Sequence, residues 1–296
     1  LLILAFGWWS VVTLILIDES PNLQNYAGLV AIVGTVVIWL LSEYFVRHRR
    51  MIGPAMALLI IFASNSAFGF TAVMSEPFMV AQNDYSSIPL PLFLATLTIL
   101  VYWWRFRVPF AMAMTAVGFF IVAIVYAASR EGRVAGFSEF FLLSAGGPFA
   151  WITLILGLLV FAVAMVFDMS DPHRVTARSA NGFWLHVVAA PALVNTMALS
   201  LLAQDGNGAK VVLLAVLAMF AIVAVVIDRR SFLIAAIGYI VALAAAVFDG
   251  DGAALTVLIL GVVLLLLGAF WERIRARILR FMPGFIPLHR LPPSQV

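Results

Sequence analysis

The chain consists mainly of apolar runs that are long enough to cross a lipid bilayer, and polar or turn-forming gaps separate them. Ten runs can be drawn, with approximate bounds at residues 1–17, 26–46, 52–74, 88–104, 109–128, 148–167, 183–203, 210–227, 231–248 and 253–271. A helix of about 20 apolar residues crosses roughly 30 Å of hydrocarbon. These runs are too long and too uniformly apolar for barrel strands, so they predict an all-α, polytopic transmembrane bundle of about ten helices.

Composition agrees with a membrane protein. Of the 296 residues, 65% are hydrophobic and 10% are charged, whereas a soluble domain is about half apolar and a quarter charged. The absence of cysteine excludes disulfides, thiolate catalysis and Cys-ligated metals. The chain is already apolar at Leu1 and shows no basic region or cleavage site of a signal peptide, so we expect the first span to be truncated at its N-terminus.

Basic residues alternate between the two sides of the predicted bundle. The gaps after every second run, together with the C-terminal tail, hold 14 of the 17 Lys and Arg residues. The other side holds Arg130, Arg133 and Lys210. Because cytoplasmic loops carry the excess of positive charge, we expect the basic gaps and the C-terminus to lie in the cytoplasm. Residues 1–271 then form a transmembrane helical domain, and residues 272–296 form a cytoplasmic basic amphipathic tail.

The tail begins with the segment ERIRARILRFMPGF, which continues the last predicted span. Helical spacing places Arg273, Arg277 and Arg280 on one exposed face. Such a face attracts anionic lipid head groups at the cytoplasmic surface, and an acidic protein partner is the alternative ligand. The basic isoelectric point near 9.6 therefore reflects this loop asymmetry, and we expect no nucleic-acid partner.

One histidine lies inside an apolar run, in the stretch GFWLHVVAAPALVN at residues 182–195. His186 follows Phe183 and Trp184, a setting typical of the aromatic belt at a membrane surface, and the alternative is a titrating group or ligand. The remaining histidines lie in predicted cytoplasmic loops or tail, namely His48, His173 and His289. None of them repeats at ligand spacing on a helix, so we expect no metal site and no haem.

Two asparagines lie deep in predicted spans. Asn65 and Asn195 are each about a dozen residues from the cytoplasmic end, so they lie at nearly one depth. Because amides in lipid commonly cross-link helices, we expect Asn65 and Asn195 to hydrogen-bond to neighbouring helices. The alternative is that they line a polar cavity or contact a substrate, and Tyr239 would then contribute a hydroxyl. Nearer the membrane surface, Glu43 adjoins the RHRR turn and is expected to form an ion pair there.

Four segments, SEYFVRHRRMIGPA, FDMSDPHRVTARSANGFWLHVVAAPALV, DRRSFLIAAIGYIVAL and LGVVLLLLGAFWERIRARILRFMP, resemble a family of uncharacterised multi-pass inner-membrane proteins of proteobacteria. The likeness extends over residues 40–285. The family has no assigned activity, so the resemblance implies a bacterial inner membrane and a short cytoplasmic leader before Leu1. It implies no functional residue.

The predicted spans contain no carboxylate, lysine or arginine at depth, and ion-coupled transport generally needs one. The sequence also has no phosphate-binding glycine loop, HExxH helix or GxSxG elbow. We therefore expect no enzymatic activity, no catalytic residue and no cofactor. The predicted function is an accessory, scaffolding or sensing component of a membrane complex, with a membrane-protein partner or a second copy of the chain. The alternative is a permease or channel for an apolar, lipid-like or small neutral solute.

Overall fold

The computed structural model describes residues 21–76, 84–133, 136–204, 206–229, 261–262, 265–266, 268–282 and 290–293. In these ranges the chain forms helices and loops without a strand, which confirms the predicted all-α class. Seven helices within the described ranges are long and apolar enough to cross a membrane, as expected of a multi-pass membrane protein. The predicted spans at residues 1–17, 231–248 and 253–271 lie wholly or largely outside the described residues, so the count of ten stays a prediction.

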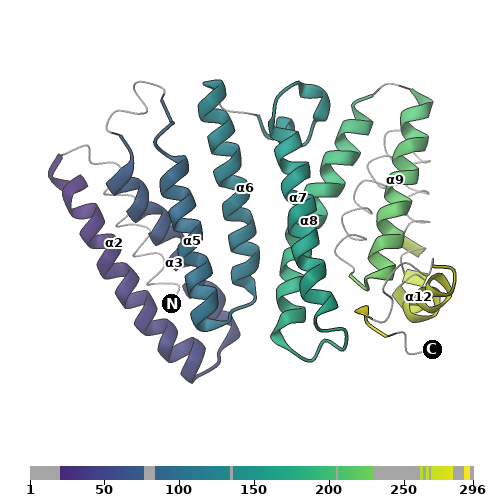
Figure 1. The fold of residues 1–296 in the computed structure, drawn as a ribbon, viewed down its shortest axis with the longest axis horizontal. Coiled ribbons are helices and arrows are strands. Elements are labelled where there is room, and N and C mark those ends of the chain that lie inside the picture. The colour runs from purple at the N-terminus through teal and green to yellow at the C-terminus, as the bar shows by residue number, and fades with distance from the viewer. Residues whose placement is uncertain are drawn as a thin grey trace. The chain divides into compact units, whose positions relative to one another are not determined.

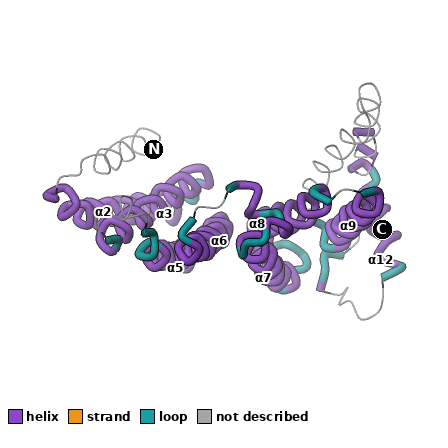
Figure 2. Tube along the Cα trace, turned by 90° about the horizontal axis from the view of Figure 1, so that it is seen from above, coloured by secondary structure: helices purple, strands orange, loops and turns teal. Residues whose placement is uncertain are grey.

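The chain divides into two compact units, Leu1–Ala135 and Gly136–Val296. The first unit contains α2 (Pro21–Ser42), the π-helical turn η1 (Glu43–His48), α3 (Ile52–Met74), α5 (Pro89–Phe106) and α6 (Phe110–Glu131). Each of its long helices packs against the next one along the chain, so the unit is a row of helices (Figure 1). In Figure 2 α5 and α6 are viewed nearly end-on, as expected for two helices that run side by side.

The core of the first unit is aromatic at the end where α2 runs into η1. Trp39, Phe62, Tyr102 and Phe106 come from three helices, and their rings lie with centroids 4.5–6.3 Å apart. Tyr102 is fully buried, and its hydroxyl lies 2.9 Å from the Ser42 hydroxyl. The pairing satisfies the polar tip of a ring that otherwise contributes apolar area to the core.

The second unit contains two short 3-10 helices, η2 (Phe137–Phe140) and η3 (Leu143–Ala145), and then α7 (Phe149–Met169), α8 (Ala177–Leu202), α9 (Asn207–Val226) and α12 (Trp271–Arg280). Helix α8 packs on both α7 and α9, and α12 packs on α9. The core between α8 and α9 is built from small and branched side chains. It consists mainly of Ala190, Leu193, Val194, Leu213, Leu217 and Phe220.

Four of the basic turns share a backbone feature. Each contains one residue other than glycine in the left-handed conformation, and these residues are Arg50, Arg107, Arg174 and Asp228, with φ of 53–55°. This conformation ends a helix abruptly but costs a non-glycine residue roughly 1–2 kcal/mol. On the opposite side of the first unit, α6 ends at Gly132, for which a φ of 64° carries no such cost. The basic turns therefore retain charged side chains at positions where the backbone alone favours glycine.

Candidate functional site

A carboxylate, an imidazole and a guanidinium meet in the second unit, at the end where α7 leads into α8. Asp168 lies in the last turn of α7, His186 lies on α8, and Arg229 follows α9. His186 Nε2 lies 3.0 Å from Asp168 Oδ2. Arg229 donates from Nε to the same oxygen at 3.0 Å and from Nη2 to Oδ1 at 2.5 Å. One carboxylate thus connects three helical segments, and its contact with Arg229 is bidentate, the strongest geometry for such a pair.

The cluster is closed to solvent. Asp168, His186 and Arg229 are exposed by only 3%, 0% and 7%. Arg229 Nη2 also donates to the Ser179 carbonyl at 2.9 Å, which joins the cluster to the first turn of α8. A buried charge is tolerated when it is paired and hydrogen-bonded, and both conditions are met here. The arrangement balances charge and holds helices together, and it leaves no open face for a water-soluble substrate.

The close approach of α7 and α8 depends on Gly182. A Cβ atom at this position would overlap the Asp168 carboxylate and press on the Ala164 carbonyl. Glycine therefore lets the two helices approach until Asp168 and His186 are within hydrogen-bonding distance. Phe161 contacts the imidazole in an edge-to-face arrangement, with ring centroids 5.5 Å apart.

A second charged group lies beside the cluster and attaches α12 to α9. Arg174 pairs with Asp228 at 2.7 Å and also donates to the Asp228 and Ile227 carbonyls, which lie at the C-terminal end of α9. Asp228 Oδ1 in turn accepts a hydrogen bond from Trp271 Nε1 at 2.7 Å. Burial lowers the pKa of Arg174, and the nearby charge of Arg229 lowers it further. The loop before α8, the end of α9 and the start of α12 are thus joined.

The loop between α7 and α8 is organised by a further carboxylate. Asp171 accepts hydrogen bonds from the Thr176 hydroxyl and from the backbone N–H groups of Val175 and Thr176, at 2.7–3.2 Å. Burial alone would raise the pKa of Asp171, but these hydrogen bonds outweigh it and hold the pKa below its ordinary value of 3.8. Thr176 itself caps α8 by accepting from Arg178 N.

The placement of His186 differs from the head-group position favoured by its aromatic neighbours. Helix α8 begins at Ala177, well before the predicted start of the span at residue 183. Its first turns pack on α7, so the imidazole faces Asp168 rather than lipid head groups. His186 is therefore a buried contact between α7 and α8, and its acidic partner, Asp168, comes from the end of α7.

In the first unit the predicted contact residue Asn65 cross-links two helices. Its Nδ2 donates to the Ala31 carbonyl at 2.9 Å and to the Thr35 hydroxyl at 2.8 Å, both on α2. Asn65 has no exposed surface. Its Oδ1 has no hydrogen-bond partner within the described part of the chain. The amide thus behaves as a neutral link between α2 and α3, with one acceptor left over.

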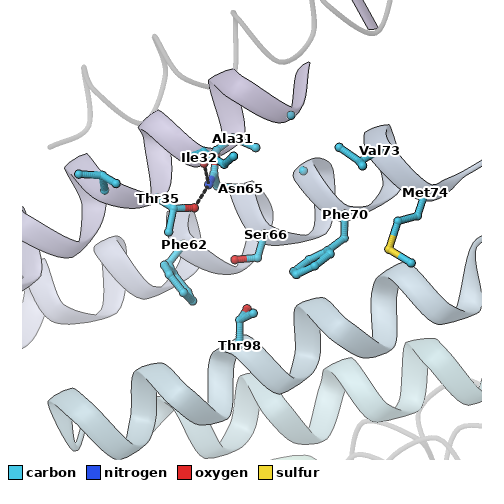
Figure 3. A pocket seen from close by; sticks show the side chains of 13 residues that line it. Ala31, Ile32, Thr35, Phe62, Asn65, Ser66, Phe70, Val73, Met74 and Thr98 are labelled. Atoms are coloured by element: carbon cyan, nitrogen blue, oxygen red, sulfur yellow. Dashed lines mark hydrogen bonds between the residues drawn. The ribbon is translucent and has the colours of Figure 1, made fainter. Parts of the chain in front are cut away.

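An apolar pocket of about 430 Å³ lies next to this link, between α2, α3 and α5 (Figure 3). Its walls are largely hydrocarbon, and Ile32, Val73 and Met74 are among them. The polar side chains among the described residues that line it are Thr35, Asn65, Ser66 and Thr98. Asn65 is fully buried, so its amide offers no exposed polar atom to a ligand in the pocket. Because the rest of the wall is largely hydrocarbon, the pocket suits an apolar ligand better than a polar one.

The remaining predicted residues are placed as follows. Asn195 is half-buried on α8 in the second unit, whereas Asn65 belongs to the first unit, and Tyr239 lies outside the described residues. The ion pair predicted for Glu43 is confirmed, because Glu43 lies 3.2 Å from Arg47. Glu43 also lies 2.6 Å from Arg105 of the next basic turn, a contact that the sequence analysis missed.

In the tail, Arg273, Arg277 and Arg280 are exposed on α12, as their spacing predicted. Arg275 is different, since it is 1% exposed and donates to the Pro292 carbonyl. No group of three His, Asp or Glu side chains in the described ranges is arranged to hold a metal ion.

Sequence reasoning missed Asp168, Arg229, Asp228 and Trp271 because they were assigned to gaps or span ends, where charge usually faces water. The available signal was the hairpin itself: FDMSDPHR and GFWLH flank one turn, and the ends of α7 and α8 must lie side by side there. Comparisons of the chain with models of protein families, with curated proteins and with solved structures found no match.

Proposed function

We propose that this protein is an accessory, scaffolding or sensing component of a membrane complex, and that it is not an enzyme. One observation carries the proposal: its membrane-embedded polar groups bond to one another. Asp168, His186 and Arg229 form a closed cluster in the second unit, and Asn65 bonds to α2 in the first. Groups that bind or conduct a hydrophilic solute face a polar cavity, whereas these groups hold helices together, and the pocket that Asn65 lines is largely apolar.

The described helices also expose broad apolar surfaces to their surroundings. On α2, for example, Leu29, Ile32 and Leu40 are 60–67% exposed. Such surfaces contact either lipid or neighbouring membrane helices. A scaffold uses some of them for partner helices, which agrees with an assembly role.

The first test is native mass spectrometry of the full-length protein after gentle extraction from its own membranes. The proposal expects a stoichiometric protein partner, or a second copy of the chain, to remain bound. A protein that is released alone, with a specific lipid or small molecule retained, contradicts this proposal and favours the second candidate below.

The second candidate is a permease or channel for an apolar, lipid-like or small neutral solute, and the pocket between α2, α3 and α5 favours it. Thr98→Phe should fill this pocket from α5 without breaking a link between helices, because the Thr98 hydroxyl bonds to Ala95 of its own helix. The matched control is Val101→Phe, which adds an aromatic ring on the exposed side of the same helix. Loss of a retained ligand in Thr98→Phe alone supports the candidate. Equal retention in both variants rejects it.

We further propose a bacterial inner membrane, ten spans and a cytoplasmic C-terminus. The alternation of basic gaps supports this topology. Since the chain has no cysteine, single cysteines report position without background. In intact cells, a membrane-impermeant maleimide should label Ser138→Cys in an outer gap, and it should label Val175→Cys in a basic loop only after lysis. If Val175→Cys is labelled in intact cells and Ser138→Cys only after lysis, the topology is the reverse of the one proposed.

A further inference from the structure

The outward face of α12 combines arginine and aromatic side chains. At about 100° per residue, the exposed arginine and phenylalanine residues fall on one arc of roughly 100°, and the exposed Glu272 lies outside this arc. Arg280 and Arg273 lie at one border, Arg277 lies near the middle, and Phe270 and Phe281 lie toward the other border, where they are 43% and 84% exposed. The face is thus basic along one edge and apolar along the other.

Two buried side chains fix the rotation of α12 about its own axis. Trp271 is 3% exposed and donates to Asp228 at the end of α9. Arg275, one turn later on the same side, is buried and donates to the Pro292 carbonyl. With both groups held inward, the arginine and phenylalanine face points away from Asp228 and Pro292.

A groove of about 610 Å³ follows this outward face. The described residues that line it are two arginines and four apolar side chains, namely Phe270, Arg273, Ile274, Arg277, Ile278 and Phe281. A guanidinium donates two parallel hydrogen bonds to a phosphate, and aromatic and branched side chains contact hydrocarbon. The groove therefore offers both halves of a phospholipid a matching surface.

The direction of α12 agrees with a place at the membrane surface. In Figure 1 α9 is seen from the side and α12 nearly end-on, so α12 lies across the helix on which it packs. Helix α9 is long and apolar enough to cross the membrane. A helix that lies across the end of a span is in the plane of the interface, where basic amphipathic helices bind anionic lipids.

We propose that this groove binds one anionic phospholipid. Arg273 and Arg277 hold its phosphate, and the first part of an acyl chain lies against Phe270 and Phe281. Arg280 adds positive charge at the border of the site. The site requires no protein partner, so the proposal goes beyond the assembly role.

The test uses the full chain in nanodiscs that contain equal amounts of phosphatidylcholine and phosphatidylglycerol, followed by native mass spectrometry of the released protein and its lipids. Wild-type protein should retain phosphatidylglycerol in preference to phosphatidylcholine. The triple variant Arg273→Gln, Arg277→Gln, Arg280→Gln should lose this preference, by roughly fivefold for each arginine. The triple Arg→Lys variant keeps the charge but cannot form the two parallel hydrogen bonds, so it should retain only part of this preference.

A second variant separates a built site from a merely basic surface. Phe281→Ser leaves the charge unchanged and removes the most exposed part of the apolar wall. We expect it to lower the number of retained phosphatidylglycerol molecules, whereas a simple basic surface would not respond. The proposal is overturned if the triple Gln variant retains as much phosphatidylglycerol as wild type, if Phe281→Ser has no effect, or if an acidic protein occupies the face in place of lipid.

Discussion

The two units join their helices by different polar chemistry. In the first unit a neutral amide, Asn65, bonds to a backbone carbonyl and a hydroxyl on α2. In the second unit Asp168 bonds to an imidazole and to a guanidinium. Neutral links between membrane helices contribute roughly 1 kcal/mol each. A buried charge left without its partner costs several times more, so the second unit depends far more on the integrity of its polar site.

The position along the helices explains why each chemistry is tolerated. Asn65 lies in the middle of α3, where a full charge would be expensive. Asp168 lies in the last turn of α7, and the arginine that neutralises it comes from the turn after α9. The buried charges of this unit thus lie near helix ends, and the negative charge of Asp168 is paired with the positive charge of Arg229.

Removal of the carboxylate should have the largest effect. Asp168→Asn leaves Arg229 buried without its counter-charge, so the free energy of unfolding should fall by about 3–5 kcal/mol. Thermal unfolding of the full chain in detergent or nanodiscs measures the loss. The matched control is Glu43→Gln, the same chemical change in a partly exposed ion pair, which should cost at most about 1 kcal/mol. Equal losses in the two variants would contradict the contrast between the units.

A double variant sharpens the same comparison. Asp168→Leu with Arg229→Met replaces the ion pair by hydrocarbon of similar size, which is often neutral for stability. The double variant should therefore unfold at a higher temperature than Asp168→Asn alone. If the double variant is the less stable one, the cluster contributes more than charge balance.

His186→Leu removes the hydrogen bond to Asp168 and keeps an apolar side chain of comparable size. Since the acceptor is a carboxylate, the free energy of unfolding should fall by about 1.5–3 kcal/mol. Asn195→Leu on the same helix is the control, because Asn195 is only half-buried, and it should change stability by less than about 1 kcal/mol. If Asn195→Leu lowers the free energy of unfolding more than His186→Leu does, Asn195 and not His186 makes the more important polar contact of α8.

Gly182→Ala tests the close approach of α7 and α8. The new methyl group would overlap the Asp168 carboxylate, and overpacking of this kind costs about 1–3 kcal/mol. The control is Gly208→Ala on α9, where a methyl group meets nothing within 4 Å and better helix propensity should leave stability equal or slightly higher. Chemical unfolding of the two variants measures both free energies of unfolding. If Gly182→Ala is as stable as wild type, α7 and α8 can separate without cost, and the close approach does not matter for stability.

In the first unit Asn65→Leu should lower the free energy of unfolding by only about 1 kcal/mol, since it removes a neutral link. Thr98→Val is the matched control beside the same pocket, because its hydroxyl bonds only within α5. A loss in Asn65→Leu as large as that in Asp168→Asn would remove the distinction between the two units.

The smallest effect concerns pH and the loop carboxylates. The lowered pKa of Asp171 means that its contribution is fully present above the ordinary pKa of 3.8 and is lost as the pH falls through the lower folded-state value. The stability difference between wild type and Asp171→Asn should therefore shrink in acid. Asp84 in the first unit, whose pKa is lowered chiefly by a hydrogen bond from Ser86 N, should show a weaker trend. Unfolding measured from neutral pH to about pH 3 compares the two substitutions, and a gap that widens in acid would be evidence against the Asp171 contacts.

The sequence predicted the helices far better than their contacts. The run at residues 52–74 coincides with α3, and the other described spans differ from prediction by a few residues at each end, because apolar periodicity and length determine a membrane helix. The pairing of Asp168 with Arg229 was beyond reach, since the two residues are far apart in sequence and meet only when α7 and α9 pack around α8. The link from Asn65 to Thr35 was closer to prediction, because an amide in lipid must find a nearby acceptor.

The contact between Gly182 and Asp168 also constrains how such a chain can change over evolution. A side chain at position 182 has room only if position 168 carries a side chain shorter than aspartate. Arg229 would then be buried without the carboxylate that neutralises its charge. The three positions should therefore be replaced together or not at all. Among homologous chains, substitutions at 168, 182 and 229 should appear as a correlated set, whereas Asn65 should vary with Thr35 alone.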